Sequence, residues 1–179
     1  MAKNGFTMSD RIRIESLTDQ GTGNPANQST KTLKVTDCGT TFLVAASGNF
    51  AVTLPSASVN KTHGVEAGGW HTTFRFTADA AVAIDQNMTF LINTKYDNVA
   101  NNSDVIDGLV IMGDKEGAAS NEVLFVTGSG TNNQLTFNSS NGYAKGTNVH
   151  IYTNADGTWH VDATALGTGT LATPFATES

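Results

Sequence analysis

The chain has 179 residues, a length typical of one domain, and a chain of this size buries about 70% of the surface that its unfolded state exposes. A net charge of -6 and a pI near 5.0 argue against a nucleic-acid partner, because phosphates are bound by clustered lysine and arginine. A single cysteine excludes an intramolecular disulfide framework, and no stretch approaches the roughly 20 apolar residues of a membrane-spanning helix. The N-terminal residues are not followed by the apolar segment of a signal peptide, so we expect a protein made in a reducing cytoplasm, with no membrane partner.

The composition favours strands over helices. Only 15% of the residues are charged, and the polar remainder is dominated by threonine and asparagine. Threonine suits strands, asparagine and glycine suit turns, and lysine, glutamate and leucine, which fill helix faces, are scarce. We therefore predict an all-β fold, an antiparallel β-sandwich or a jelly-roll-like barrel with an extended N-terminal arm.

Residues 1–31 are predicted to form that arm, because they end in a polar run, residues 19–30, that buries too little apolar area to order itself. Earlier in the arm, charged and apolar residues alternate with the period of a strand. The alternating residues are Arg11, Ile12, Arg13, Ile14 and Glu15. This piece is expected either to add as an edge strand to its own sheet or a neighbour's, or to remain a solvated tail.

A β domain is predicted over residues 32–162, where short β-rich runs alternate with glycine-containing turns. The predicted strands before the last hairpin are residues 33–35, 41–44, 50–54, 72–77, 82–84, 88–92, 105–106, 109–112, 123–126 and 135–137. Residues 95–103 are polar and rich in asparagine, which predicts a long surface loop.

The last hairpin has the most specific signal. A three-residue loop at residues 155–157, with Gly157 in the left-handed conformation, would pair Ile151 with Val161 and Thr153 with Trp159 on the core face. The opposite face would carry two further pairs, Tyr152 with His160 and His150 with Asp162. The hairpin is followed by a C-terminal tail, residues 163–179, which is expected to be either a last edge strand or an interface arm with Leu171 and Phe175 as contacts.

No catalytic, cofactor-binding or metal-binding residues are predicted. Ser129 lies between two glycines in a turn, without the helix that follows a nucleophilic serine in hydrolases. The four histidines, at positions 63, 71, 150 and 160, lack the spacing of a zinc site. Cys38 is expected to be a small buried residue rather than a reactive thiol.

Five segments carry a resemblance to a known class of proteins. Residues 37–44, 50–55 and 69–76 look like the N-terminal half of small β-rich virion proteins of tailed bacteriophages, and residues 146–152 and 156–161 resemble their final hairpin. Proteins of this class are commonly capsid decoration proteins, also called cement proteins, which have no active site and bind the outer shell as oligomers.

The resemblance implies a structural protein of the virion, made in the host cytoplasm, that binds the capsid surface and stabilises it. The implied partners are the major capsid protein and further copies of this chain, with a trimer favoured over a dimer. The predicted interface residues are Arg11, Ile12, Arg13, Ile14, Tyr96, Leu171 and Phe175. The alternative is a tail-fibre or receptor-binding β module that recognises host surface glycans. An enzyme acting on such glycans is the third hypothesis.

Overall fold

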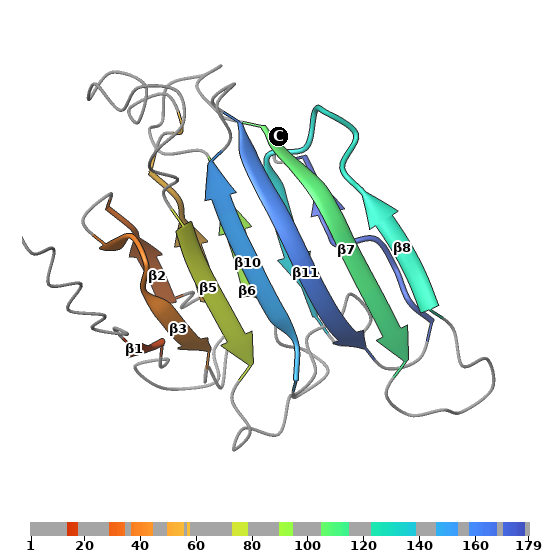
Figure 1. The fold of residues 1–179 in the computed structure, drawn as a ribbon, viewed down its shortest axis with the longest axis horizontal. Coiled ribbons are helices and arrows are strands. Elements are labelled where there is room, and N and C mark those ends of the chain that lie inside the picture. Colours follow the sequence, from red (N-terminus) through yellow and green to blue (C-terminus); the bar gives the residue numbers. More distant parts are fainter. Residues whose placement is uncertain are drawn as a thin grey trace, which may run out of the picture.

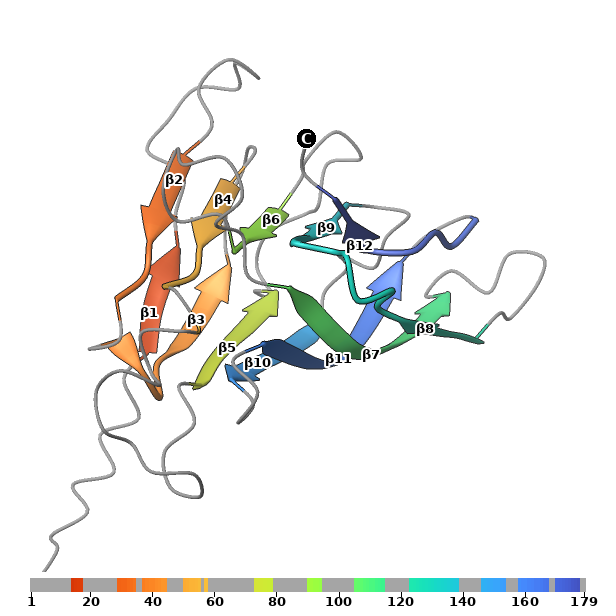
Figure 2. The ribbon, with the colours of Figure 1, turned by 90° about the horizontal axis from the view of Figure 1, so that it is seen from above.

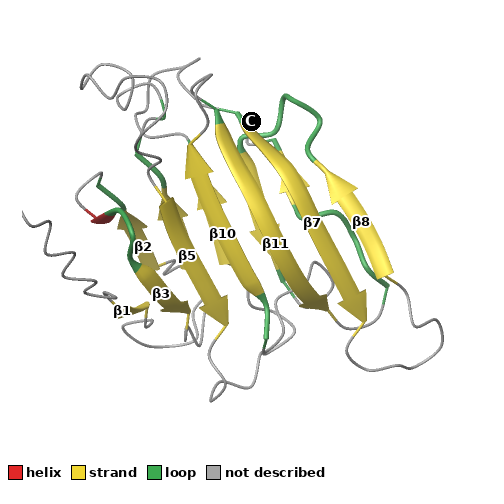
Figure 3. Cartoon of the chain, in the orientation of Figure 1, coloured by secondary structure: helices red, strands yellow, loops and turns green. Residues whose placement is uncertain are grey.

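The computed structural model describes residues 14–17, 29–34, 37–44, 50–55, 57, 73–78, 90–94, 105–114, 123–138, 146–153, 158–167 and 170–177. These residues form strands, turns and one short 3-10 turn that includes Asp37, and none of them lies in an α-helix (Figure 3). No helix in this part of the chain has the length and apolarity needed to cross a membrane.

The strands form two facing sheets, which confirms the prediction of an all-β sandwich (Figure 2). Sheet A contains, in spatial order, β1 (Ile14–Leu17), β3 (Thr41–Val44), β5 (Thr73–Ala78), β10 (Asn148–Thr153), β11 (Trp159–Gly167), β7 (Ile106–Asp114) and β8 (Val123–Thr127), as Figure 1 shows. Sheet B contains β12 (Phe175–Ala176), β9 (Gln134–Phe137), β6 (Phe90–Asn93), β4 (Phe50–Thr53) and β2 (Ser29–Thr32).

The first six strands alternate between the sheets, so the chain winds around the core like a parallel β-helix. In sheet A, β3 lies between β1 and β5 and is parallel to both, and in sheet B, β4 is likewise parallel to β2 and β6. The expectation of purely antiparallel sheets is therefore corrected: the sandwich is mixed. Parallel neighbours need a crossover of a dozen or more residues, and here each crossover contains a strand of the opposite sheet.

The second half of the chain is largely antiparallel. β10 pairs with β5 and with β11, β7 pairs with β8, and β9 lies between β6 and β12. The exception is the nine-residue parallel pairing of β7 with β11. This pairing joins the hairpin of β7 and β8 to the hairpin of β10 and β11 in one continuous sheet.

Phenylalanines from both sheets stack through the core between them. The rings of Phe42 and Phe76, neighbours in sheet A, lie 5.4 Å apart, and Phe76 reaches Phe90 of sheet B at 5.6 Å. Phe50 and Phe137 flank Phe90 in sheet B, each at 6.4 Å. Aromatic pairs at such separations attract each other beyond their area burial, so this stack ties the two sheets together.

The predicted N-terminal arm contributes two strands to the fold. β1 adds to the edge of sheet A and β2 to the edge of sheet B. The segment around Ile14 therefore adds to a sheet of its own chain, which is one of the predicted alternatives. The ammonium group of Lys31, in β2, lies 5.2 Å from the centre of the Phe42 ring, a cation–π contact at the end of the phenylalanine stack. The C-terminal tail also takes its edge-strand alternative: β11 extends to Gly167, and β12 pairs with β9.

Most predicted strands in the described part of the chain are found where expected, with two differences. The predicted runs at 105–106 and 109–112 are joined in one strand, β7, which begins at Ile106, and residues 33 and 34 follow β2 without forming a strand. Residues 82–84 and 95–103 lie outside the described residues. Cys38 is exposed, not buried, because it lies in a turn in which the amide of Thr40 donates to the carbonyl of Asp37.

Trp159 should contribute strongly to stability. Its side chain is fully buried, and its strand position lies between Thr153 of β10 and Ile106 of β7. We expect Trp159→Ala to lower the free energy of unfolding by about 3 to 5 kcal/mol, as for other buried large aromatics, measured by urea denaturation. A loss below about 1 kcal/mol would contradict the buried position.

Gly108 is the position where the pairing of β7 with β11 requires glycine. Its φ is 126°, and a Cβ atom there would meet the backbone carbonyl of Val161 and lie 2.7 Å from the Val161 nitrogen. We expect Gly108→Ala to destabilise the fold by at least about 2 kcal/mol in urea denaturation. Gly130→Ala is the matched control, because Gly130 also has positive φ but open space around it. Equal losses in the two variants would rule out the steric explanation.

Candidate functional site: the outer face of sheet A

The outer face of sheet A is set by the register of β10 and β11. The observed partners are Ile151 with Val161, Thr153 with Trp159, Tyr152 with His160 and His150 with Asp162, which confirms the predicted register in full. The first two pairs are buried and the last two point outward, as the alternation of a strand requires.

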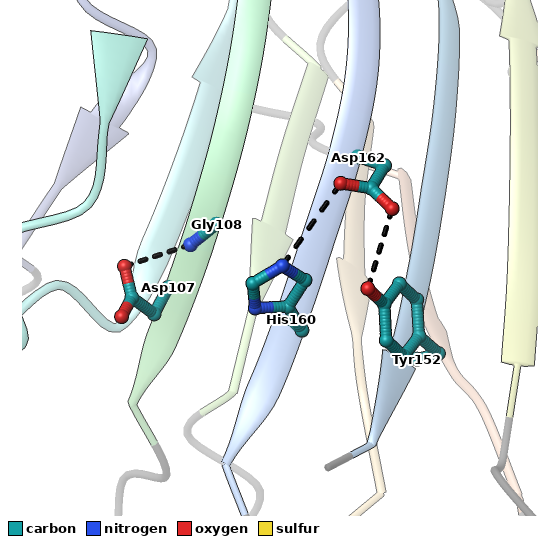
Figure 4. Close-up of polar contacts among 5 residues, drawn as sticks. All are labelled: Asp107, Gly108, Tyr152, His160 and Asp162. Carbon is teal, nitrogen blue, oxygen red and sulfur yellow. Dashed lines mark hydrogen bonds and ion pairs between the residues drawn. The ribbon is translucent and has the colours of Figure 1, made fainter.

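Three aromatic rings gather around one carboxylate on this face. The Tyr152 ring lies 5.1 Å from the ring of His150 and 5.1 Å from the ring of His160. The Tyr152 hydroxyl donates to Asp162 Oδ2 at 3.2 Å, and Nε2 of His160 lies 3.9 Å from Asp162 Oδ1 (Figure 4). We call His150, Tyr152, His160 and Asp162 the ring cluster.

A shallow hollow of about 310 Å³ lies beside the ring cluster and spans β10, β11 and β7. On the central strand, Asp162 and Thr164 are short side chains, and they face Leu109 and Ile111 of β7 on one side. On the other side they face His150 and Asn148 of β10. The hollow therefore has one apolar wall and one polar wall. Its lining residues are Leu109, Ile111, Asn148, His150, Asp162, Ala163 and Thr164.

The apolar wall continues onto β8, at the edge of the sheet. Phe125 is the partner of Ile111, and it is 67% exposed. Val123 is 61% exposed, and Leu124, on the other face of the strand, is 38% exposed. The described part of the chain leaves these side chains exposed, and we call Val123 and Phe125 the apolar surface at β8.

The predicted interface residues do not gather at this face. Leu171 and Phe175 are 9% and 8% exposed and pack in the core of the chain itself, which leaves little of either side chain for contact with another protein. Ile14 lies in β1, at the opposite edge of sheet A from β8. The other predicted interface residues, Arg11, Ile12, Arg13 and Tyr96, lie outside the described residues.

Ser129 and Asp107 are each held by hydrogen bonds to nearby residues. Ser129 is held in a tight turn, where its amide and its hydroxyl both donate to Asn132 Oδ1, at 2.8 and 2.9 Å. The carboxylate of Asp107 accepts the amide of Gly108 at 2.7 Å, which fixes it beside its own backbone (Figure 4). In the described part of the chain, no group of three or more His, Cys, Asp or Glu side chains is placed to hold a metal ion. His63 and His71 lie outside that part.

Comparisons with known proteins add no assignment: no family model, curated protein or solved structure matches this chain.

The sequence predicts the ring cluster but not the exposure of the apolar surface at β8. The run Val-Leu-Phe-Val at residues 123–126 predicts a strand. A continuous apolar run is typical of a strand buried on both faces. A usable signal was present: residues 123–127 contain no charged side chain to protect an edge. Only the strand order shows that this run is at an edge.

The ring cluster gives a test through the ionisation of Tyr152. Burial is the main cause that raises the pKa of its phenol above the usual 10.0, and the negative charge of Asp162 and the hydrogen bond to it raise the pKa further. The unfolded chain therefore loses the phenol proton of Tyr152 at a lower pH than the folded chain does. The stability that Tyr152 contributes is complete below about pH 10, and it is lost as the pH rises through the pKa of the folded state.

We expect Asp162→Asn to lower the pKa of Tyr152 only part of the way towards 10.0, since burial remains. The measurement is an absorbance titration of tyrosinate, with Tyr152→Phe identifying the signal of Tyr152 among the three tyrosines. Superimposable curves for the wild type and Asp162→Asn would show that the two side chains do not interact in solution.

Proposed function

We propose that the chain is a structural protein of a bacteriophage virion that binds the outer surface of the capsid and stabilises it. The observation that carries the proposal is the exposed apolar surface at β8, where Val123 and Phe125 are 61% and 67% exposed. A surface of this chemistry suits contact with other proteins. The hairpin and the N-terminal strands resemble those of decoration proteins, which supports a phage capsid as the partner in that contact.

The architecture suits a mechanical task. The phenylalanine stack and the long pairing of β7 with β11 connect the strands into a rigid body. A capsid under internal pressure is held by many modest contacts that act together, so each contact can be small. A partner that binds only the intact shell stabilises it by mass action at every occupied site. On this proposal the protein works at the capsid surface, with the major capsid protein as its partner and without a cofactor.

A receptor-binding module that recognises host glycans is the second candidate. The observation that favours it is the hollow beside the ring cluster, where Asn148 and Asp162 offer amide and carboxylate groups next to the rings of His150 and Tyr152. Polar groups combined with aromatic rings can bind a sugar through hydrogen bonds and stacking. Capsid binding ranks first because the exposed side chains of Val123 and Phe125 are apolar, which suits a protein contact better than a sugar contact.

The proposal predicts that particles without this protein still assemble but lose their genome at lower temperature. Stripped particles, decorated particles and stripped particles with purified protein added back are heated, and genome release is followed with a DNA dye. We expect the release temperature to rise with occupancy, because each bound copy stabilises only the closed shell.

The double variant Tyr152→Ala/His160→Ala separates the two candidates. It should restore the release temperature as well as the wild type does, because the ring cluster has no part in the capsid contact. Equal release temperatures with and without the protein, together with host adsorption that depends on these two residues, would overturn the capsid proposal and favour glycan binding.

A further inference from the structure

The backbone of β8 has one free edge, and the hydrogen bonds to β7 show which residues face it. The amide of Gly128 donates to the carbonyl of Gly108 at 3.3 Å, so these opposite residues form a hydrogen-bonded pair. In an antiparallel ladder such pairs alternate with non-bonded ones. In the continuous register of β7 and β8, Leu124 and Val126 therefore bond towards β7, while Val123, Phe125 and Thr127 point their amides and carbonyls away from it.

This free edge lacks the usual protection against pairing. Exposed edge strands of natural proteins carry charged side chains, prolines or bulges that prevent another strand from adding. Residues 123–127 contain neither a charged residue nor a proline, and their register with β7 is unbroken. Among the described strands, β8 pairs with β7 alone. Its edge and its apolar side chains are thus both available to the same partner.

The sequence of the strand matches a second copy of itself. β8 has five residues with Phe125 at the centre, so an antiparallel copy related by a twofold axis at Phe125 is in register over the whole strand. The three residues with free backbone groups then face each other: Phe125 lies opposite its own counterpart, and Val123 lies opposite Thr127. Each of these opposite positions is a hydrogen-bonded pair, and the two Phe125 rings meet on the outer face.

We propose that β8 binds β8 of a second copy of this chain in antiparallel orientation, about a twofold axis at Phe125, which joins the two A sheets into one. Edges paired in this way close after two copies, so the assembly unit at this edge is a dimer and not the trimer expected from the resemblance. The proposal goes beyond capsid binding: the pairing uses the backbone groups of β8, and it sets the apolar side chains of two copies side by side on the outer face of the joined sheet.

The contact area indicates a dissociable dimer. A fully buried aromatic removes about 150–250 Å² from water, so two Phe125 side chains that are each 67% exposed contribute at most about 200–340 Å². Stable dimers bury about 1,200 Å² or more in total, and Val123 and the backbone ladder add only part of the difference. The dimer should therefore form at high local concentration, as on a surface that holds many copies, and dissociate in dilute solution.

Cysteine cross-linking tests the register. In a Cys38→Ser background, Phe125→Cys places two thiols on the twofold axis, about 5.5 Å apart between Cα atoms, within the range of a disulfide. Val123→Cys is the matched control, because its two copies lie about 13 Å apart along the strands. Mild oxidation at about 0.5 mM protein should give covalent dimers of Phe125→Cys and monomers of Val123→Cys. A mixture of Val123→Cys with Thr127→Cys chains should again give dimers.

Sedimentation velocity tests the association without a covalent bond. The wild type should shift from monomer to dimer as its concentration rises, whereas Phe125→Lys should stay monomeric at about ten times that concentration, because two like charges would meet on the axis. Thr164→Lys places the same charge on the exposed outer face of β11, away from the edge, and should behave as the wild type does.

Two results would overturn the proposal: no more covalent dimer from Phe125→Cys than from Val123→Cys, or equal self-association of wild type and Phe125→Lys. Both assays omit the capsid, so their failure leaves the capsid proposal standing. A failed heat-release experiment likewise leaves the twofold pairing untouched.

Discussion

The phenylalanine stack between the sheets is the interaction on which the other parts of the fold depend. Phe76 of sheet A and Phe90 of sheet B meet at 5.6 Å, and each also contacts a ring in its own sheet. Aromatic contacts of this kind contribute about 0.5–1.5 kcal/mol each beyond the burial of their area. The stack is what aligns the parallel strands: a slip of one residue would move a ring from the core to the surface.

The C-terminal half of the chain extends sheet A beyond this aligned core. β10 pairs with β5 of the wound half, and β11 then brings β7 and β8 into the same sheet. The close approach of β7 to β11 depends on Gly108, which no larger residue can replace without moving the backbone of Val161. The ring cluster and the apolar surface at β8 therefore lie on the same sheet. One strand, β7, separates β11 from β8.

The two halves of the outer face have different chemistry, and this division is consistent with an assembling protein. The ring cluster is polar and already satisfied within the chain, since Tyr152 donates to Asp162. The apolar surface at β8, formed by Val123 and Phe125, stays largely exposed in the described part of the chain. Removing this apolar surface from water is favourable. On a lattice, a weak twofold contact also gains from the high local concentration of copies.

The sequence by itself determined the all-β class, most strand positions and the complete register of the last hairpin. These are local properties: alternation with period two assigns faces, and a short loop between Thr153 and Trp159 leaves only one pairing that buries Ile151 and Val161. The tertiary structure alone decided which strands are neighbours. Parallel and antiparallel neighbours bury the same residues, so the winding of β1 to β6 leaves no trace in the alternation. For the same reason the apolar run at 123–126 could be read as buried, whereas its place at the end of sheet A exposes it.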